Sequence, residues 1–223
     1  MHVLLVHGAL GSASQLQPLR EAFGSRNTSV VELEGHGGTP GSNDRYSMEH
    51  FAHQIGAAIT RDTVVFGYSM GGYAALLLAA QRPVHLKGIV TLGTKLAWNP
   101  EMAAREVARL HAPTIRAKVP KFAAQLDERH RGAGGWENVL DKTATLMTGL
   151  GAKPLVDEGV FTAIEVPVRL MVGDRDTLVT IDETASAARK VPQGQLAVLP
   201  GTPHPIEQVR PGVVVSMIED FLR

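Results

Sequence analysis

Short apolar segments recur along this chain of 223 residues, and most of them are followed by a longer stretch with helical spacing. The first, residues 3–6, is a continuous apolar run, which is typical of a strand buried on both faces of a parallel sheet. The predicted strands are residues 3–6, 28–33, 63–67, 86–92, 166–173 and 195–199. Between them, apolar residues recur at the helical period, as at Leu16, Leu19 and Phe23. This alternation predicts an α/β fold with a mostly parallel, doubly wound sheet.

The alternation stops over residues 97–164, where the sequence is helical throughout. Helices are expected to begin near Pro100, Pro120, Trp136 and residue 157, two of them at a proline, which the first helical turn favours. A helical insertion of this size between two strands predicts a lid. We therefore predict one domain over residues 1–223, with a core of residues 1–96 and 165–223 and a lid subdomain of residues 97–164.

Composition narrows the classes of function. Hydrophobic residues make up 44% and charged residues 20% of the chain, as in ordinary globular domains. Lys+Arg and Asp+Glu are equal at 22 each, so no charge excess favours nucleic acid or an anionic membrane as a partner. The chain contains no cysteine, which excludes disulfides, thiol catalysis and zinc–thiolate sites. The expected partner is a small-molecule substrate, and no pattern predicts an oligomeric state.

Targeting and membrane signals are weak. The N-terminal apolar run of four residues is too short for the apolar region of a signal peptide. The longest apolar run, residues 74–80, falls far below the ~18–20 residues that cross a bilayer. We expect a cytoplasmic protein.

The third predicted strand leads through Gly67-Tyr68-Ser69-Met70-Gly71 directly into strong helix formers. Gly-x-Ser-x-Gly between a strand and a helix is typical of a nucleophile elbow. Such a sharp turn holds the serine in a strained backbone conformation and exposes its hydroxyl. Glycine is expected on both sides because a Cβ there would collide with a neighbouring strand or helix. The pattern predicts Ser69 as a nucleophile.

Other polar motifs follow predicted strands, at the edge where parallel α/β sheets bind ligands. They are His7-Gly8-Ala9, Gly173-Asp174-Arg175-Asp176 and His204 between two prolines. Together with Gly35-His36-Gly37, the elbow and the position of the lid, the order serine, aspartate, histidine resembles that of the α/β-hydrolase superfamily. The resemblance covers nearly the whole chain. It implies an α/β-hydrolase fold whose sheet starts at the His-Gly strand and carries a helical lid insertion.

The resemblance also implies roles for these residues. Ser69 would attack an electrophilic carbon, and His204 would take its proton and later return one to the leaving group. The acid that orients His204 is expected to be Asp176, the last residue of Gly-x-x-Asp, while Asp174 is the competing choice and is expected to support the loop. The backbone N–H groups of Ala9 and Met70 would form the oxyanion hole.

The remaining candidate residues concern the pocket and the other histidines. Possible pocket residues are Leu10, Tyr68, Trp98 and Leu178. His50 and His53 share a helix face without a further ligand at metal spacing, so we predict a solvated face and no metal site. His7 and His36 are expected to brace their glycine-rich loops. No cofactor is expected.

The leading hypothesis is a serine hydrolase that cleaves carboxylic esters of a small or medium apolar acyl group through an acyl-enzyme. A second hypothesis is carbon–carbon bond chemistry on the same triad, because the elbow and the His7–Ser12 loop resemble those of the menaquinone-pathway lyase family. In that family an arginine usually follows the double glycine, whereas this chain has Tyr73. A third hypothesis is a non-catalytic ligand-binding receptor, which would need neither a nucleophile nor a general base.

Overall fold

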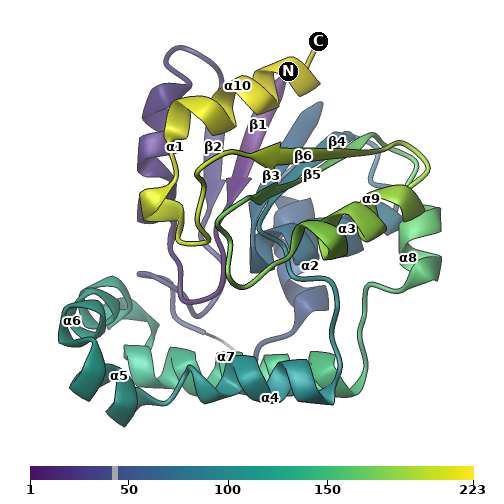
Figure 1. Cartoon of the computed structure of the whole chain (residues 1–223). Helices are drawn as coiled ribbons and strands as arrows, with labels where there is room; N and C mark the ends of the chain where they lie inside the picture. The colour runs from purple at the N-terminus through teal and green to yellow at the C-terminus, as the bar shows by residue number, and fades with distance from the viewer. Residues whose placement is uncertain (42–44) are drawn as a thin grey trace.

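A computed structural model describes residues 1–41 and 45–223 of the chain. Its centre is one sheet of six parallel strands in the order β2-β1-β3-β4-β5-β6 (Figure 1). The strands are β1 His2–Val6, β2 Thr28–Val31, β3 Thr63–Tyr68, β4 Leu86–Leu92, β5 Val168–Gly173 and β6 Gly194–Leu199. The structure therefore contains every strand that the apolar segments predict, with boundaries that differ by at most two residues.

The strand order reverses at β1, which lies between β2 and β3. The chain leaves β1 toward one edge and returns to build the rest of the sheet from β3, so the β1–β3 boundary is the crevice at which such sheets bind ligands. Val6, the last residue of β1, pairs in register with Gly67 near the end of β3. The loop that follows β1 is thereby brought beside the turn at Ser69.

Helices cover both faces of the sheet, and alternate strand residues serve opposite faces. Helices α1 (Gln17–Ala22) and α10 (Pro211–Phe221) pack together over one core cluster, which contains Val3 and Leu5. The second cluster contains Leu4 and Val6. It is covered by α2 (Met48–Ala57), α3 (Met70–Ala80) and α9 (Ile181–Lys190). Single-turn 3-10 helices lie at Ala13–Leu16, Arg131–Ala133 and Ile206–Gln208.

The insertion between β4 and β5 contains α4 (Pro100–Ala108), α5 (Ala112–Lys118), α6 (Pro120–Arg129), α7 (Trp136–Ala152) and α8 (Glu158–Ala163). Helix α5 was not expected as a separate element; it starts anew because Pro113 lies in its first turn. Helix α7 runs past residue 147 despite its glycines. A Cβ on Gly151 would lie 2.4 Å from that of Ala103, so this glycine lets α7 pack closely on α4.

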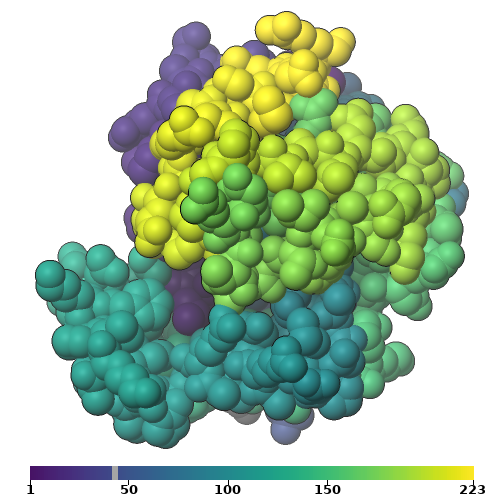
Figure 2. All heavy atoms as spheres, viewed as in Figure 1, coloured from purple at the N-terminus to yellow at the C-terminus, as the bar shows by residue number. Residues whose placement is uncertain are grey.

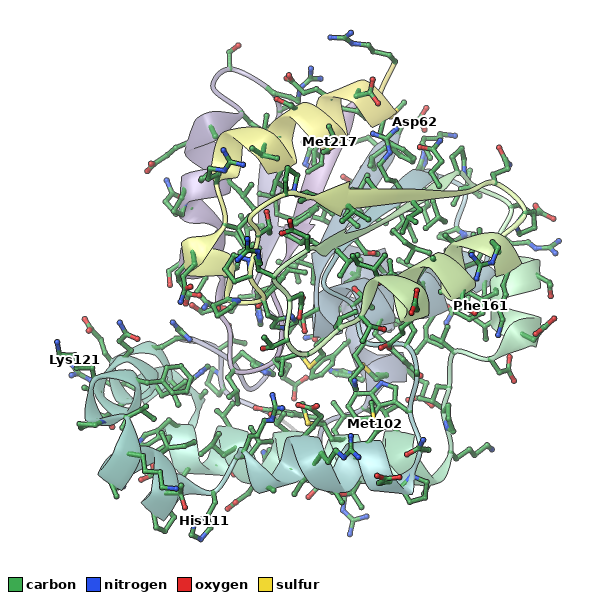
Figure 3. All side chains as sticks on the ribbon, in the orientation of Figure 1. Asp62, Met102, His111, Lys121, Phe161 and Met217 are labelled. Carbon is green, nitrogen blue, oxygen red and sulfur yellow. The ribbon has the colours of Figure 1, made fainter. Side chains whose placement is uncertain are left out.

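The insertion divides into two parts. Helices α4–α7, which we call the insertion helices, extend across the space beyond the carboxyl ends of the strands (Figure 1). Helix α8 instead packs on α3 and α9, and its Phe161 belongs to the main core (Figure 3). Within residues 97–164, helices α4–α7 therefore differ from α8 in what they pack against. In Figure 2, N-terminal residues in purple lie at the bottom of a recess between the insertion helices and the core. No helix in the described ranges is long and apolar enough to cross a membrane.

Candidate active site

Ser69 is the single residue between β3 and α3. Its backbone has φ +50° and ψ −114°, an unfavourable conformation for a residue with a side chain, costing on the order of 1–3 kcal/mol. The turn is fixed because the Ser69 N–H donates to Leu92 O (2.9 Å) and its carbonyl accepts from the Thr94 hydroxyl (3.1 Å). A Cβ on Gly67 would lie 2.5 Å from Gly72 Cα, which explains why this turn requires glycine.

His204 and Asp176 meet at the same edge of the sheet. Nδ1 of His204 lies 2.7 Å from Oδ2 of Asp176. The other carboxylate oxygen accepts from the N–H groups of Leu178 (2.8 Å) and Val179 (2.9 Å). Burial by itself would raise the pKa of Asp176, but the hydrogen bond and charge of His204, with the two amides, hold that pKa below its ordinary value. An ionised Asp176 requires the proton of neutral His204 on Nδ1, which leaves Nε2 free to act as a base.

Asp174 takes a different place. Its side chain is exposed, and its Oδ1 accepts from the N–H of Thr202 at 3.2 Å. The bond ties the loop after β5 to the loop that carries His204. The geometry therefore brings Asp176, and not Asp174, to the histidine.

Two neighbours support His204 without an obvious sequence signal for that contact. The Tyr68 hydroxyl donates to the carbonyl of His204 at 2.9 Å, and burial raises the pKa of Tyr68, so it remains a donor. Gly93 has φ +62°, and a Cβ there would lie 3.1 Å from both Asp176 Oδ2 and His204 Nδ1. A side chain at position 93 would crowd this pair and would be strained at this positive φ. Nothing in the pattern around Gly93 predicts the contact, because its partners lie far along the chain.

The two expected oxyanion donors lie next to Ser69. Met70 is the first residue of α3, so its N–H has no acceptor within the helix and lies at the positive end of the helix dipole. Ala9 follows the His-Gly pair at the end of β1. Both residues line the cavity that also contains Ser69 and His204.

His7 lies beneath this loop and is fully buried. Its Nδ1 lies 2.8 Å from the carbonyl of Gly8, and its Nε2 accepts from the N–H of Leu33 at 3.0 Å. Burial lowers the pKa of His7 to about 4, so the ring is neutral near pH 7. His36 is also buried, stacks on Tyr46 at 4.7 Å between ring centroids, and has a pKa well below its usual value because of burial. Both rings thus lie against the glycine-rich loops that they are expected to brace.

The site opens into two connected cavities. The inner one has about 540 Å³ of unfilled space, its mouth included, and the outer one about 950 Å³. Apolar side chains dominate the inner cavity: Met48, Tyr73, Trp98, Leu146, Met147 and Leu150. The outer cavity is lined by Leu10, Tyr68, Leu110, Ile115, Phe122 and Pro205, among others. All four predicted pocket residues line one cavity or the other, and Leu178 lines both. Figure 3 shows sulfur atoms in the space between the insertion helices and the sheet.

Charged side chains are few around the inner cavity. Lys95 donates to the carbonyl of Leu178 (3.1 Å) and lies 4.0 Å from Glu183. Glu106 of α4 lines both cavities; its side chain is 13% exposed, and Arg109 lies 3.7 Å from it. In residues 1–41 and 45–223, no group of three or more potential ligands is arranged to hold a metal ion.

Comparison with known proteins adds to this geometry. Residues 3–217 match the sequence profile of the alpha/beta hydrolase family. The chain belongs to the alpha/beta hydrolase family. The match confirms the predicted α/β-hydrolase fold, and with it the resemblance drawn from the His-Gly loop, the elbow and the terminal histidine.

Relatives within the alpha/beta hydrolase family are distant. The pimeloyl-(acyl-carrier protein) methyl ester esterase of Aromatoleum aromaticum is 27% identical over 215 residues, covering 86% of this chain and 85% of that protein. A 2-succinyl-6-hydroxy-2,4-cyclohexadiene-1-carboxylate synthase of Escherichia coli is 31% identical over 98 residues. The match covers 41% of this chain and 37% of the synthase. The solved structure of a thermophilic esterase from Thermogutta terrifontis has a TM-score of 0.76 at 24% identity, covering all of this chain and 89% of that one.

Proposed function

We propose that this alpha/beta hydrolase cleaves carboxylic esters of small or medium apolar acyl groups through a covalent acyl-enzyme on Ser69. The observation that carries the proposal is the 2.7 Å contact between His204 and the ionised Asp176, on the wall of the cavity that contains Ser69 at its strained turn. Nucleophile, base and orienting acid are the three groups that acyl transfer requires.

In the first half-reaction, the Ser69 hydroxyl oxygen attacks the ester carbonyl carbon while His204 Nε2 takes the hydroxyl proton. The electron pair of the C=O bond moves to the oxygen, where the N–H groups of Ala9 and Met70 stabilise the negative charge. Collapse of this intermediate breaks the bond to the alcohol oxygen, which leaves with the proton from His204. Water then attacks the acyl-enzyme by the same route and releases the acid. Neither step calls for a cofactor.

The cavities suggest where the two parts of the ester lie. The inner cavity is enclosed by apolar side chains of α3, α7 and Trp98, which favours the acyl group there. The outer cavity is the larger of the two, and its lining includes the charged Arg109 and Arg129, which suits a more polar alcohol. The insertion helices would then act as a lid that carries substrate specificity.

A second candidate is carbon–carbon bond cleavage or elimination on the same triad, and the partial match to the cyclohexadiene-carboxylate synthase favours it. Against it stands Tyr73, in the place of an arginine, whose hydroxyl oxygen accepts from the N–H groups of Leu155 (2.9 Å) and Val156 (2.8 Å). The ammonium group of Lys95 is already engaged by Glu183 and Leu178. A substrate carboxylate would therefore find little free positive charge in the inner cavity.

The test is a panel of p-nitrophenyl esters with acyl chains from acetate to dodecanoate, assayed on the wild type and Ser69→Ala. We expect kcat/KM to peak at a short or medium chain in the wild type and to vanish in the variant. Turnover that survives in Ser69→Ala would contradict the proposal. A folded wild type that hydrolyses no ester, yet binds apolar ligands, would favour the receptor hypothesis.

A further inference from the structure

The loop that carries Ala9 contains a second strained residue. Leu10 has φ +56°, a left-handed conformation that costs a branched side chain roughly 1–2 kcal/mol. Such a conformation persists only where surrounding contacts determine it. The contacts come from the insertion: the carbonyl of Leu10 accepts from Arg129 Nη1 at 2.8 Å and lies 3.0 Å from His130 Nε2. Both donors come from the end of α6, about 120 positions away along the chain.

His130 is satisfied on both sides of its ring. Its Nδ1 lies 3.0 Å from the backbone N of Gly37, an amide that can only donate, so Nδ1 must be the acceptor. The proton of neutral His130 is therefore on Nε2 and points to the Leu10 carbonyl. The ring is fully buried. One side chain of the insertion thus joins the two core loops that follow β1 and β2.

The backbone around His130 is also docked on the core. A Cβ on Gly132 would lie 2.6 Å from the carbonyl oxygen of Gly38, so the two chain segments lie in direct backbone contact. Arg129 is held in turn by Glu207, whose Oε1 lies 3.1 Å from Nη2. These contacts attach the end of α6 to three loops of the core.

We propose that Arg129 and His130 are positioning residues for the oxyanion hole: they fix the Leu10 carbonyl, and through the strained Leu10 they fix the residue before it, Ala9, whose N–H lies on the Gly8–Ala9 peptide. This inference rests on the proposed function. A hole donor is effective only within about 2.7–3.1 Å of the developing oxyanion, and a displacement of 1 Å can reduce the rate ~100-fold. The insertion then contributes to the chemical step as well as to substrate choice.

The sharpest test compares two substitutions of one residue. In His130→Gln, the side-chain amide nitrogen occupies roughly the place of Nε2 and still donates to Leu10. In His130→Asn, the side-chain oxygen occupies roughly the place of Nδ1 and accepts from Gly37, but residue 130 no longer donates to Leu10, whose carbonyl keeps only Arg129. With p-nitrophenyl butyrate we expect His130→Asn to lower kcat about 10- to 100-fold with KM within twofold. His130→Gln should recover kcat to within about fivefold of the wild type.

Arg129→Met provides an independent variant, because it removes the second donor and leaves His130 in place. Its control is Arg131→Met, since Arg131 is exposed and forms no hydrogen bond or ion pair within the described part of the chain. We expect Arg129→Met to lower kcat about 5- to 20-fold and Arg131→Met to change it less than twofold. Equal, small effects of both substitutions would overturn the proposal.

A binding readout separates positioning from simple destabilisation. An alkylboronic acid forms a tetrahedral adduct with the serine and places an oxygen in the oxyanion hole, so its Kd should rise in His130→Asn by about the factor lost in kcat. Folded His130→Asn with unchanged kcat and boronate affinity would overturn the proposal while leaving esterase activity intact. If wild-type turnover itself does not depend on Ser69, the proposed function fails, and this inference with it.

Discussion

On the sheet side of the cavity, Ser69, Asp176 and His204 stand at strand ends, and backbone hydrogen bonds or tight glycine turns fix each of them. On the insertion side, the cavity is lined by side chains of α4 and α7, and those of α7 include the apolar Met147 and Leu150. The difference suggests a division of labour, in which the sheet wall performs the chemistry and the insertion wall selects the substrate. The Arg129–His130 attachment joins the second wall to the first.

The largest effect should come from the sheet wall. We expect Ser69→Ala and His204→Ala each to lower kcat for p-nitrophenyl butyrate by at least ~1,000-fold, because each removes a group that the covalent route requires. The assay is steady-state release of p-nitrophenolate. Ser216→Ala, at an exposed serine of α10, is the matched control and should have no effect. A loss confined to KM in either site variant would place these residues in binding rather than in chemistry.

The two aspartates of the β5 loop should differ strongly. Asp176→Asn removes the negative charge that orients and stabilises His204, and we expect kcat to fall roughly 100- to 10,000-fold. Asp174→Asn keeps an oxygen that can accept from Thr202, so its kcat should stay within about threefold of the wild type. Both are measured at pH 7.5 with the same ester. The reverse order of effects would show that the orienting acid is misassigned.

Acid should lower the stability of the folded protein, because three buried histidines lie in the loops near the site and at their contact with the insertion. His7, His36 and His130 are buried, and burial lowers the pKa of all three, to about 4 for His7. The unfolded chain binds more protons than the folded one below pH ~6.5, so stability is present above that value and is lost as the pH falls toward 4. We expect the free energy of unfolding to fall by about 2–4 kcal/mol between pH 7 and pH 5.

Urea unfolding at several pH values measures this loss. His36→Leu should reduce the slope by up to one proton, about 1.4 kcal/mol per pH unit. A stability that does not vary over this range would mean that the three rings are protonated in the folded protein.

On the insertion wall, Glu106 should tune selectivity for charge. Its carboxylate is mostly buried beside the cavities, so we expect it to disfavour esters whose acyl group ends in a carboxylate. Glu106→Gln should raise kcat/KM for a p-nitrophenyl hemisuccinate about 3- to 10-fold, and should change that for the butyrate less than twofold. Glu101→Gln, exposed on the same helix, is the control. An equal gain for both esters would show that the charge of Glu106 does not determine this selectivity.

The smallest effect concerns stability. Thr143 of α7 is fully buried, and its hydroxyl has no hydrogen-bond partner among residues 1–41 and 45–223. We expect Thr143→Val to raise the free energy of unfolding by roughly 0.5–1 kcal/mol, because it removes an unsatisfied polar group. Thr145→Val, on the exposed side of α7, carries the same helix-propensity cost and should lower stability slightly. A destabilised Thr143→Val would indicate that the hydroxyl is satisfied.

The sheet wall could be predicted from the sequence because its signals are local. The elbow, the Gly-x-x-Asp loop and the short apolar strands each lie within ten residues, and the order of parallel strands brings their carboxyl ends to one edge. The fold followed from the same patterns and is confirmed by the family match. Strand boundaries at β2 and β5 moved by two residues, where turn residues compete with apolar ones.

The insertion wall could not be predicted in the same way, because its decisive contacts join distant positions. Nothing near His130 indicates that its ring meets Leu10 and Gly37. On the sheet wall one contact is equally distant, because nothing near Gly93 indicates the approach of His204. Helix α8 has the same helical pattern as α4–α7, but it packs on the core because Phe161 and Ile164 fit beside α3. Periodicity identifies a helix without specifying its packing partner.

The central claim is that Ser69 is an activated nucleophile on the sheet wall. The direct measurement is labelling with a fluorophosphonate probe, followed by peptide mass spectrometry. We predict one phosphonyl group on the peptide that contains Ser69, no label in Ser69→Ala, and labelling at least ~100-fold slower in His204→Ala. A folded wild type that stays unlabelled at saturating probe, or that carries the label on another residue, would contradict the claim.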